Sequence, residues 1–156
     1  MLKTVEVYTD GGASGNPGPG GYGLHMRYGK HVKEHSEGFR LTTNNRMELL
    51  AVIVSLELLK KPDQSVQVFS DSKYVVDAVE KGWVFKWEKK NFAKAKNSDL
   101  WKRFLEVYRQ HQVKFNWVKG HAGNELNERV DFLAVEAYKT GNLKADTWYE
   151  ENVANA

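Results

Sequence analysis

The sequence contains no cysteine, and this absence excludes disulfide bonds, thiolate catalysis and a cysteine-ligated zinc site. The longest unbroken apolar run covers residues 49–54, which is far too short to span a bilayer. Residues 1–3 lead directly into an alternating pattern rather than into an apolar secretory segment. These absences predict a cytoplasmic protein that suits a reducing compartment and has no membrane partner.

No internal repeat and no linker divides the 156 residues. A hydrophobic content of 41% and five tryptophans suffice for a core of its own in a chain of this length. We therefore expect one compact domain over residues 1–142. Beyond it, one lysine stands against three acids, so residues 143–156 are expected to form a flexible, solvated acidic tail.

The net charge is only +3, but positive charge is concentrated in one segment. Between residues 81 and 96 a single acid, Glu88, stands against six lysines, which are Lys81, Lys86, Lys89, Lys90, Lys94 and Lys96. A solvated charged face over buried aromatic rings is the plainer interpretation, and we prefer it for Trp101 and Phe104. Trp83 and Trp87 are spaced i, i+4 amid the lysines, which indicates a groove for nucleic acid. An anionic membrane is less favoured, because the segment has no continuous apolar face.

Hydrophobic periodicity predicts an α/β fold. The expected strands cover residues 4–9, 22–28, 32–41, 66–70 and 113–118. The expected helices run from residue 45 to before Pro62 and over residues 71–80, 99–111 and 126–140. Residues 11–21, dominated by glycine and proline, are expected to be a loop. Strands first, followed by alternating helices and strands, predict a mixed sheet covered by helices.

Four carboxylates occupy places near the ends of these elements rather than in solvated charge runs, and they are Asp10, Glu48, Asp71 and Asp131. Each alone has a structural explanation. Asp10 can start a turn, and Asp71 can cap a helix. Glu48 can close a capping box with Asn45, and Asp131 can be a solvated acid beside an apolar stripe. Two of the acids, however, follow strand ends, where ligand clefts form in open α/β folds. If the fold brings all four carboxylates together, their mutual repulsion has to be offset by bound cations.

The cation that this pattern predicts is Mg²⁺, because Mg²⁺ binds through a few carboxylates and keeps positions for water and phosphate oxygens. Two such ions about 3.5 to 4 Å apart can activate a water and stabilise the leaving oxygen of a phosphodiester. His121 stands among small loop residues and is a candidate proton carrier, with an inert surface histidine as the alternative. The glycines at 18, 20 and 23 satisfy G-x-G-x-x-G, but a strand pattern follows them, so a dinucleotide site is rejected.

Six motifs occur in a fixed order, and they are YTDG (8–11), GNPGPGG (15–21), TTNNRMEL (42–49), SDSKYV (70–75), WVKGHAG (117–123) and NERVD (127–131). In this combination the chain resembles bacterial type I ribonuclease H. The resemblance covers residues 1–142, as a catalytic domain with a basic protrusion at about 81–97. It implies a five-stranded mixed sheet, the first three strands antiparallel, with helices on both faces. It also implies an endonuclease that hydrolyses the RNA strand of RNA/DNA hybrids and leaves 3′-hydroxyl and 5′-phosphate ends.

The resemblance also assigns roles to residues. The implied catalytic residues are Asp10, Glu48, Asp71, His121 and Asp131, of which the four acids would hold two Mg²⁺ ions that Mn²⁺ can replace. The implied nucleic-acid contacts are Asn16, Thr43, Asn44, Asn45, Lys73, Trp83, Trp87, Lys89, Lys90 and Asn127. The implied partner is an RNA/DNA hybrid, and the default oligomeric state is a monomer. Two alternatives stay open, namely a hybrid- or duplex-binding module without catalysis and a resolvase or integrase-like enzyme that acts on DNA.

Overall fold

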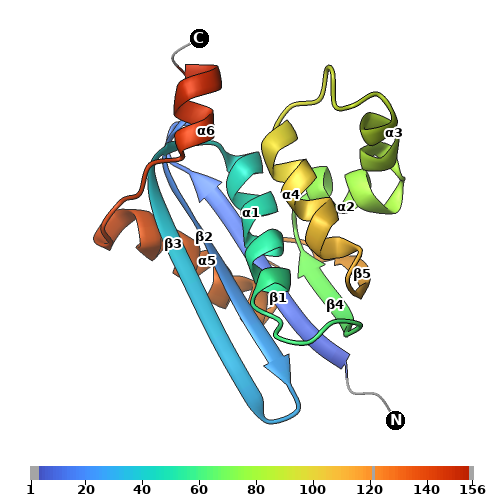
Figure 1. Cartoon of the computed structure of the whole chain (residues 1–156). Coiled ribbons are helices and arrows are strands. Elements are labelled where there is room, and N and C mark those ends of the chain that lie inside the picture. Colours follow the sequence, from blue (N-terminus) through green and yellow to red (C-terminus); the bar gives the residue numbers. More distant parts are fainter. Residues whose placement is uncertain (1–3, 121, 155–156) are drawn as a thin grey trace.

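The computed structural model describes residues 4–120 and 122–154 and contains a five-stranded sheet (Figure 1). The strands are β1 (Thr4–Ala13), β2 (Gly18–Tyr28), β3 (His31–Thr42), β4 (Ser65–Ser70) and β5 (Gln112–Trp117). Their order across the sheet is β3-β2-β1-β4-β5. The first three strands are antiparallel, whereas β4 pairs in parallel with both β1 and β5. The predicted mixed sheet is therefore confirmed.

Helices cover both faces of the sheet. They are α1 (Asn44–Glu57), α2 (Lys73–Glu80), α3 (Trp83–Lys89), α4 (Ser98–Tyr108), α5 (Glu125–Thr140) and α6 (Thr147–Tyr149), followed by a π-helical turn (Glu150–Ala154). In Figure 1, α1 lies in front of the sheet and α5 behind it. Within the described ranges, no helix combines the length and apolar character needed to cross a bilayer.

Helix α1 lies at the centre of the domain, as its nearly continuous apolar sequence predicts. Met47, Leu49 and Ile53 are fully buried, although Met47 points to a different side of the helix from Leu49 and Ile53. On the far side of α1, Trp101 and Phe104 of α4 are also fully buried, which confirms their assignment to the core. Burying one such side chain stabilises the fold by about 1.5 to 3 kcal/mol. This packing fixes the position of α1 against β1, which matters for the site described below.

The prediction that residues 11–21 form a loop is wrong for most of the segment. Strand β1 continues to Ala13 and β2 begins at Gly18, so the connection comprises only residues 14–17. The glycines serve close packing of helices on the sheet. A Cβ atom on Gly21 would lie 2.6 Å from the carbonyl oxygen of Ala134 in α5, well inside contact distance. Glycine here permits helix α5 to approach the strands.

The chain from Lys144 to Glu150 packs against the domain, so the prediction of a frayed, solvated tail is wrong for this part. Lys144 forms two backbone hydrogen bonds with β3. Asp146 is buried and forms an ion pair with Arg46 of α1. Glu150 accepts two hydrogen bonds from Arg40. Acids that composition assigns to solvent are thus paired with arginines of the domain.

Candidate active site

Asp10 and Asp71 meet where β1 and β4 separate. The parallel pairing of the two strands ends at Thr9 and Ser70. The residue after each of these lies at the carboxyl edge of the sheet, where the diverging strands open a cleft. Asp10 is still paired with β2, and Asp71 follows β4 directly. The structure therefore brings these two acids together from positions far apart in the sequence.

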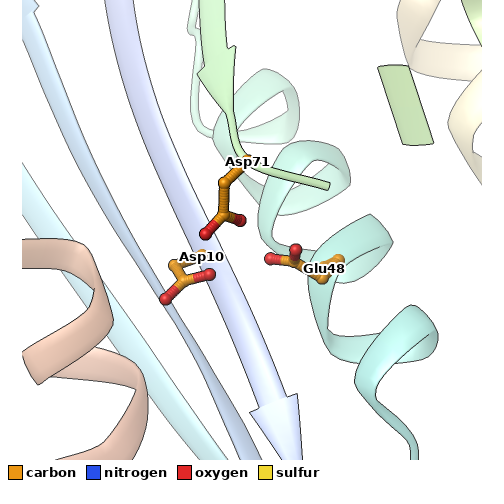
Figure 2. Close-up of side chains that lie close together, drawn as sticks. All are labelled: Asp10, Glu48 and Asp71. Carbon is orange, nitrogen blue, oxygen red and sulfur yellow. The ribbon is translucent and has the colours of Figure 1, made fainter. Parts of the chain in front are cut away.

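Glu48 reaches the same cleft from α1. One carboxylate oxygen each from Asp10, Glu48 and Asp71 lies within 4.8 Å of the other two, as the close-up in Figure 2 illustrates. Helix α1 comes this close to β1 because residue 11 is glycine. A Cβ atom on Gly11 would lie 2.3 Å from the backbone carbonyl carbon of Met47. The absence of that one atom allows Glu48 to face Asp10.

Neither Glu48 nor Asp71 caps a helix. The cap of α1 is Thr43, whose hydroxyl oxygen accepts a hydrogen bond from a backbone N–H of the first turn. The cap of α2 is Ser72, whose hydroxyl oxygen does the same. The structural explanations for these two acids are therefore wrong, and another role has to account for the burial of Glu48 and the partial burial of Asp71.

Residues at the end of β5 hold Asp71. The indole N–H of Trp117 donates a hydrogen bond to the carbonyl oxygen of Asp71 at 3.1 Å. A Cβ atom on Gly120 would lie 2.8 Å from the Asp71 carboxylate, so glycine lets this loop pass beside it. Lys73 places its ammonium group 4.8 Å from the centre of the Trp117 ring. The loop leads to His121, the predicted proton carrier, which lies outside the described residues.

Helix α5 carries the last acid, Asp131, and also Asn127. Asp131 lines the same cleft as the other three acids and acts on the pKa of Asp10. Asn127 is only 3% exposed, in the first turns of α5. Its side chain is not offered on the surface, and its contact with nucleic acid stays a prediction.

The cluster perturbs the pKa values of its own members. Burial, followed by the negative charge of Asp71, raises the pKa of Asp10 to about 8. Burial, followed by the charges of Asp10 and Asp71, raises the pKa of Glu48 well above its ordinary value. Without a cation, the cleft therefore retains protons at neutral pH.

The raised pKa of Asp10 predicts that the cation-free protein loses stability as the pH rises. In the unfolded chain Asp10 ionises near pH 4, whereas in the fold its pKa is about 8. Between these values the folded state binds more protons, so the free energy of unfolding falls with rising pH. One such group gives a slope of about 1.4 kcal/mol per pH unit. Thermal unfolding in EDTA, followed from about pH 5 to about pH 8, measures this slope.

The matched control for this prediction is Asp10→Asn, which removes the titrating group. We expect the variant to show a flatter dependence and to exceed the parent in stability at about pH 7. Glu34 does not affect the slope in this pH range. The hydrogen bond from Arg129 lowers the pKa of Glu34 to about 2, so its contribution to the free energy of unfolding is lost only below its ordinary pKa. Equal slopes for parent and variant would contradict the prediction.

The donor atoms fit a hard divalent cation. They are all carboxylate oxygens, the ligand type that Mg²⁺ and Mn²⁺ prefer. Across residues 4–120 and 122–154, the Oε1 atom of Glu48 is buried yet has no hydrogen-bond partner. Leaving such an acceptor unpaired costs about 1 to 3 kcal/mol, which a bound cation would offset. The acids line an open cleft of about 460 Å³, which leaves room for a phosphate group beside them.

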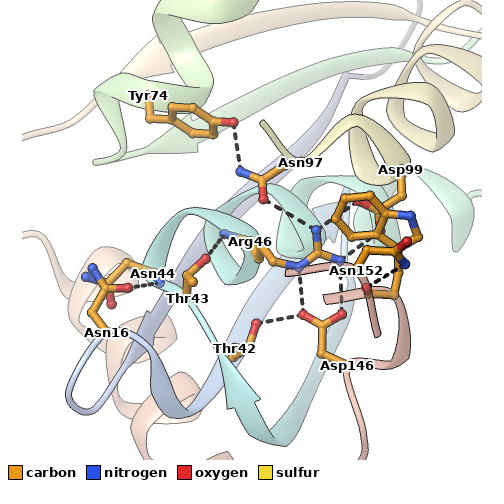
Figure 3. Close-up of polar contacts among 11 residues, drawn as sticks. Asn16, Thr42, Thr43, Asn44, Arg46, Tyr74, Asn97, Asp99, Asp146 and Asn152 are labelled. Carbon is orange, nitrogen blue, oxygen red and sulfur yellow. Dashed lines mark hydrogen bonds and ion pairs between the residues drawn. The ribbon is translucent and has the colours of Figure 1, made fainter. Parts of the chain in front are cut away.

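The predicted nucleic-acid contacts at the start of α1 lie beside this cleft, and Asn44 and Asn45 are part of its lining. The backbone N–H of Ala13 donates to the side-chain oxygen of Asn44 at 2.6 Å. The backbone N–H of Asn44 in turn donates to the side-chain oxygen of Asn16 at 2.9 Å (Figure 3). Because both amide oxygens are engaged inside the protein, the NH₂ groups are the part of each side chain that can donate outward.

The basic protrusion consists of α3 and its connection to α4 (Figure 1). Lys89 and Lys90 are exposed at the end of α3. Trp83 is 40% exposed, as a stacking surface requires. Trp87 is half-buried instead, with its ring centre 5.7 Å from that of the buried Trp101. The two tryptophans thus differ, and Trp83 presents the larger ring surface to a ligand.

Sequence reasoning assigned no role to two residues that connect the site to its surroundings. Tyr74 lines the cleft, and its hydroxyl oxygen accepts a hydrogen bond from Asn97. Arg46 is 1% exposed and forms ion pairs with Asp99 and Asp146. An arginine directly before the long apolar stretch of a central helix was a usable signal, because a buried cation needs partners. No local signal distinguishes Tyr74 from an ordinary core tyrosine.

Fold and site together define a class of protein. The acidic cleft at the carboxyl edge of the mixed sheet suits cations that activate a phosphodiester. The amide donors on one side of the cleft and the basic protrusion on another suit the backbone of a nucleic acid. This combination is typical of a nuclease. Comparison with known proteins then gives the family, since residues 2–139 match the sequence profile of RNase H.

Several relatives resemble the chain over nearly its whole length. A ribonuclease H of Desulforamulus reducens is 57% identical over 93% of this chain and 94% of the relative. A ribonuclease H of Syntrophus aciditrophicus is 53% identical over 94% and 87%. The solved structure of LC9-RNase H1, a type 1 RNase H, shares 30% identity with a TM-score of 0.80 over 98% of this chain and 82% of that one. LC11-RNase H1, solved in complex with an RNA/DNA hybrid, shares 29% identity with a TM-score of 0.64 over 86% and 96%.

The chain belongs to the ribonuclease H family, which confirms the resemblance inferred from its motifs. It is an enzyme, and family membership makes it an endonuclease for RNA.

Proposed function

We propose that this chain hydrolyses the RNA strand of RNA/DNA hybrids by two-metal-ion phosphodiester cleavage and leaves 3′-hydroxyl and 5′-phosphate ends. The observation that carries the proposal is the convergence of Asp10, Glu48 and Asp71 within 4.8 Å in an open cleft. The hybrid named in the LC11-RNase H1 complex supports the choice of substrate.

Asp10, Glu48, Asp71 and Asp131 would hold the cations, with Mg²⁺ as the expected ion and Mn²⁺ as a substitute. When bound, the ions supply activation of a water molecule and stabilisation of the leaving 3′-oxygen. The chain contributes the positions of the carboxylates that would hold these ions. Its carboxylates come from the separating ends of β1 and β4 and from helices on both faces of the sheet, so their spacing is set by the rigid core. Loss of the protons that the cleft retains accompanies cation binding.

His121 would carry the proton in this reaction. The ordinary pKa of an imidazole lies near neutrality, which suits a histidine to protonate the leaving 3′-oxygen or to help a water depart. The support for this role is that Gly120, the residue before His121 in the sequence, lies against the Asp71 carboxylate.

The amide groups of Asn16, Asn44 and Asn45 would contact the hybrid in its minor groove. Purine N3 and pyrimidine O2 atoms are acceptors there, and RNA adds 2′-hydroxyl groups. Asn16 and Asn44 match these acceptors because their oxygens are already engaged within the protein. Thr43, which caps α1 next to them, would contact a DNA phosphate.

The basic protrusion would hold the DNA strand. Lys89 and Lys90 can neutralise phosphates, and the exposed ring of Trp83 can stack on a sugar or base. Trp87 would add its half-buried edge, and Lys73 lies at the border of the acidic cleft. A monomeric state and a cytoplasmic location remain part of the proposal.

The test is a cleavage panel with an end-labelled hybrid, duplex DNA and duplex RNA. We expect Mg²⁺-dependent cutting of the hybrid's RNA strand alone, complete inhibition by EDTA, and products whose 5′-phosphate supports ligation. Binding of the hybrid without any cutting would favour the non-catalytic module instead. Cutting of duplex DNA would favour the resolvase or integrase-like alternative.

A further inference from the structure

Arg46 is the centre of a buried polar cluster that also contains Asp99, Asp146, Asn97 and Tyr74, here called the Arg46 cluster (Figure 3). Its guanidinium group donates to Asp146 through Nε at 2.7 Å and Nη2 at 2.9 Å. It donates to Asp99 through Nη1 and Nη2, both at 2.8 Å. A further bond from Nη1 reaches the side-chain oxygen of Asn97 at 3.4 Å. A guanidinium with five N–H donors is thereby held in one orientation.

One side of the Arg46 cluster is formed by the segment after α5. Asp146 also accepts a hydrogen bond from the hydroxyl group of Thr42, at 2.8 Å. The rings of Trp148 and Tyr149 lie 5.1 and 5.8 Å from the guanidinium carbon. The segment thus closes over Arg46 and shields its ion pairs from water.

The other side of the cluster reaches the acidic cleft. Asn97 stands at the start of α4, where the basic protrusion ends, and its φ of 59° is left-handed. Its amide NH₂ donates to the hydroxyl group of Tyr74 at 3.0 Å. Tyr74 belongs to α2 and lines the cleft. Arg46 itself belongs to the first turn of α1, next to Asn44 and Asn45.

The Arg46 cluster therefore joins the two sides of the groove in which a hybrid would lie. We propose that it is a positioning device, and that Asp146 and Asn97, acting through Arg46, set the distance between the first turn of α1 and the basic protrusion. The inference rests on the proposed function, because these two surfaces are the proposed contacts for the hybrid. A duplex must touch both at once, so a change in their spacing weakens binding.

Two observations favour positioning over simple stabilisation. Well-packed apolar side chains often replace a buried ion-pair network without loss of stability, so stability alone does not call for one here. Directional hydrogen bonds instead fix one relative arrangement of the elements that they join, and this cluster joins α1, α2, α4 and the tail. The carboxylates depend on a separate contact, the approach of α1 to β1 at Gly11. The cluster should therefore affect binding of the hybrid and not the chemical step.

The experiment compares Asn97→Gly and Asp146→Asn with the parent at saturating Mg²⁺. Asn97→Gly removes both links of residue 97 without leaving a buried charge unpaired, and glycine tolerates the left-handed backbone. For both variants we expect KM for the hybrid to rise about fivefold to tenfold while kcat stays within about twofold. The dissociation constant of the hybrid, from fluorescence anisotropy in EDTA, should rise by the same factor.

The matched control is Glu150→Gln, which breaks the exposed pair with Arg40 in the same tail. This variant should leave KM unchanged. Unchanged KM in folded Asn97→Gly, a fall in kcat alone, or an equal effect of Glu150→Gln would overturn the inference. Thermal unfolding of each variant shows whether it is folded at the assay temperature. If the parent itself failed to cut the hybrid, the proposed function would fall, and the anisotropy measurement would still decide the role of the cluster.

Discussion

The variant Asp10→Asn should lose about 10²- to 10³-fold in kcat for hydrolysis of the hybrid, the loss typical of removing one preorganised electrostatic group. Asparagine keeps the shape of the side chain but offers a neutral oxygen where a cation needs charge. Asp10 lies between the other acids of the cleft, so no neighbour can substitute for it. Steady-state cleavage of a labelled hybrid at saturating Mg²⁺ measures the effect.

Binding of the hybrid should survive this change. The amide groups of Asn16 and Asn44 and the lysines of the protrusion are untouched by this change. The variant should also stay folded, because it removes the group whose ionisation destabilises the cation-free protein. A suitable control is Asp77→Asn, which affects only a surface pair with Lys81 and should keep kcat within about twofold. Residual activity of Asp10→Asn above about a tenth of the parent would show that the four acids do not act as one cation site.

Much of this site could be predicted from sequence because its parts follow local rules. Asp10 and Asp71 each come directly after a strand pattern, and parallel strand ends share one edge of a sheet. The apolar sequence of α1 places that helix at the core and so brings Glu48 to the same edge. Local alternatives for Glu48 and Asp71 failed because the neighbouring hydroxyls of Thr43 and Ser72 already cap the helices.

The errors share a different cause, which is that the deciding partner is remote in sequence. Asp146 was assigned to solvent because its segment holds one lysine against three acids, yet it pairs with Arg46, 100 residues earlier. The glycine at 21 was assigned to a loop, although the space that it leaves is filled by the backbone of α5 at Ala134 and by the side chain of Ala137. Composition describes a segment and its neighbours in the sequence. The burial and pairing of a side chain depend instead on which remote segment packs against it in the fold. Only the assembled fold supplies that information.

Gly11→Ala should be strongly damaging, although glycine carries no functional group. The added Cβ would lie 2.3 Å from the carbonyl carbon of Met47 and 2.5 Å from the backbone nitrogen of Glu48. Both are backbone atoms of a central helix and cannot move aside alone, so α1 has to shift away from β1. Such overpacking costs about 3 kcal/mol, and thermal unfolding should show a Tm lower by about 6 to 12 °C.

The same shift should reduce activity beyond what unfolding explains. Glu48 would move away from Asp10, and a displacement of about 1 Å can lower the rate about 100-fold. Cleavage assays well below the new Tm separate this effect from loss of folded protein. The control is the neighbouring glycine: a Cβ on Gly12 would meet only the side-chain oxygen of Asn44, at an ordinary 3.7 Å. Gly12→Ala should therefore stay within about 0.5 kcal/mol of the parent and retain activity. Equal behaviour of the two variants would mean that the contact of α1 with β1 does not set the position of Glu48.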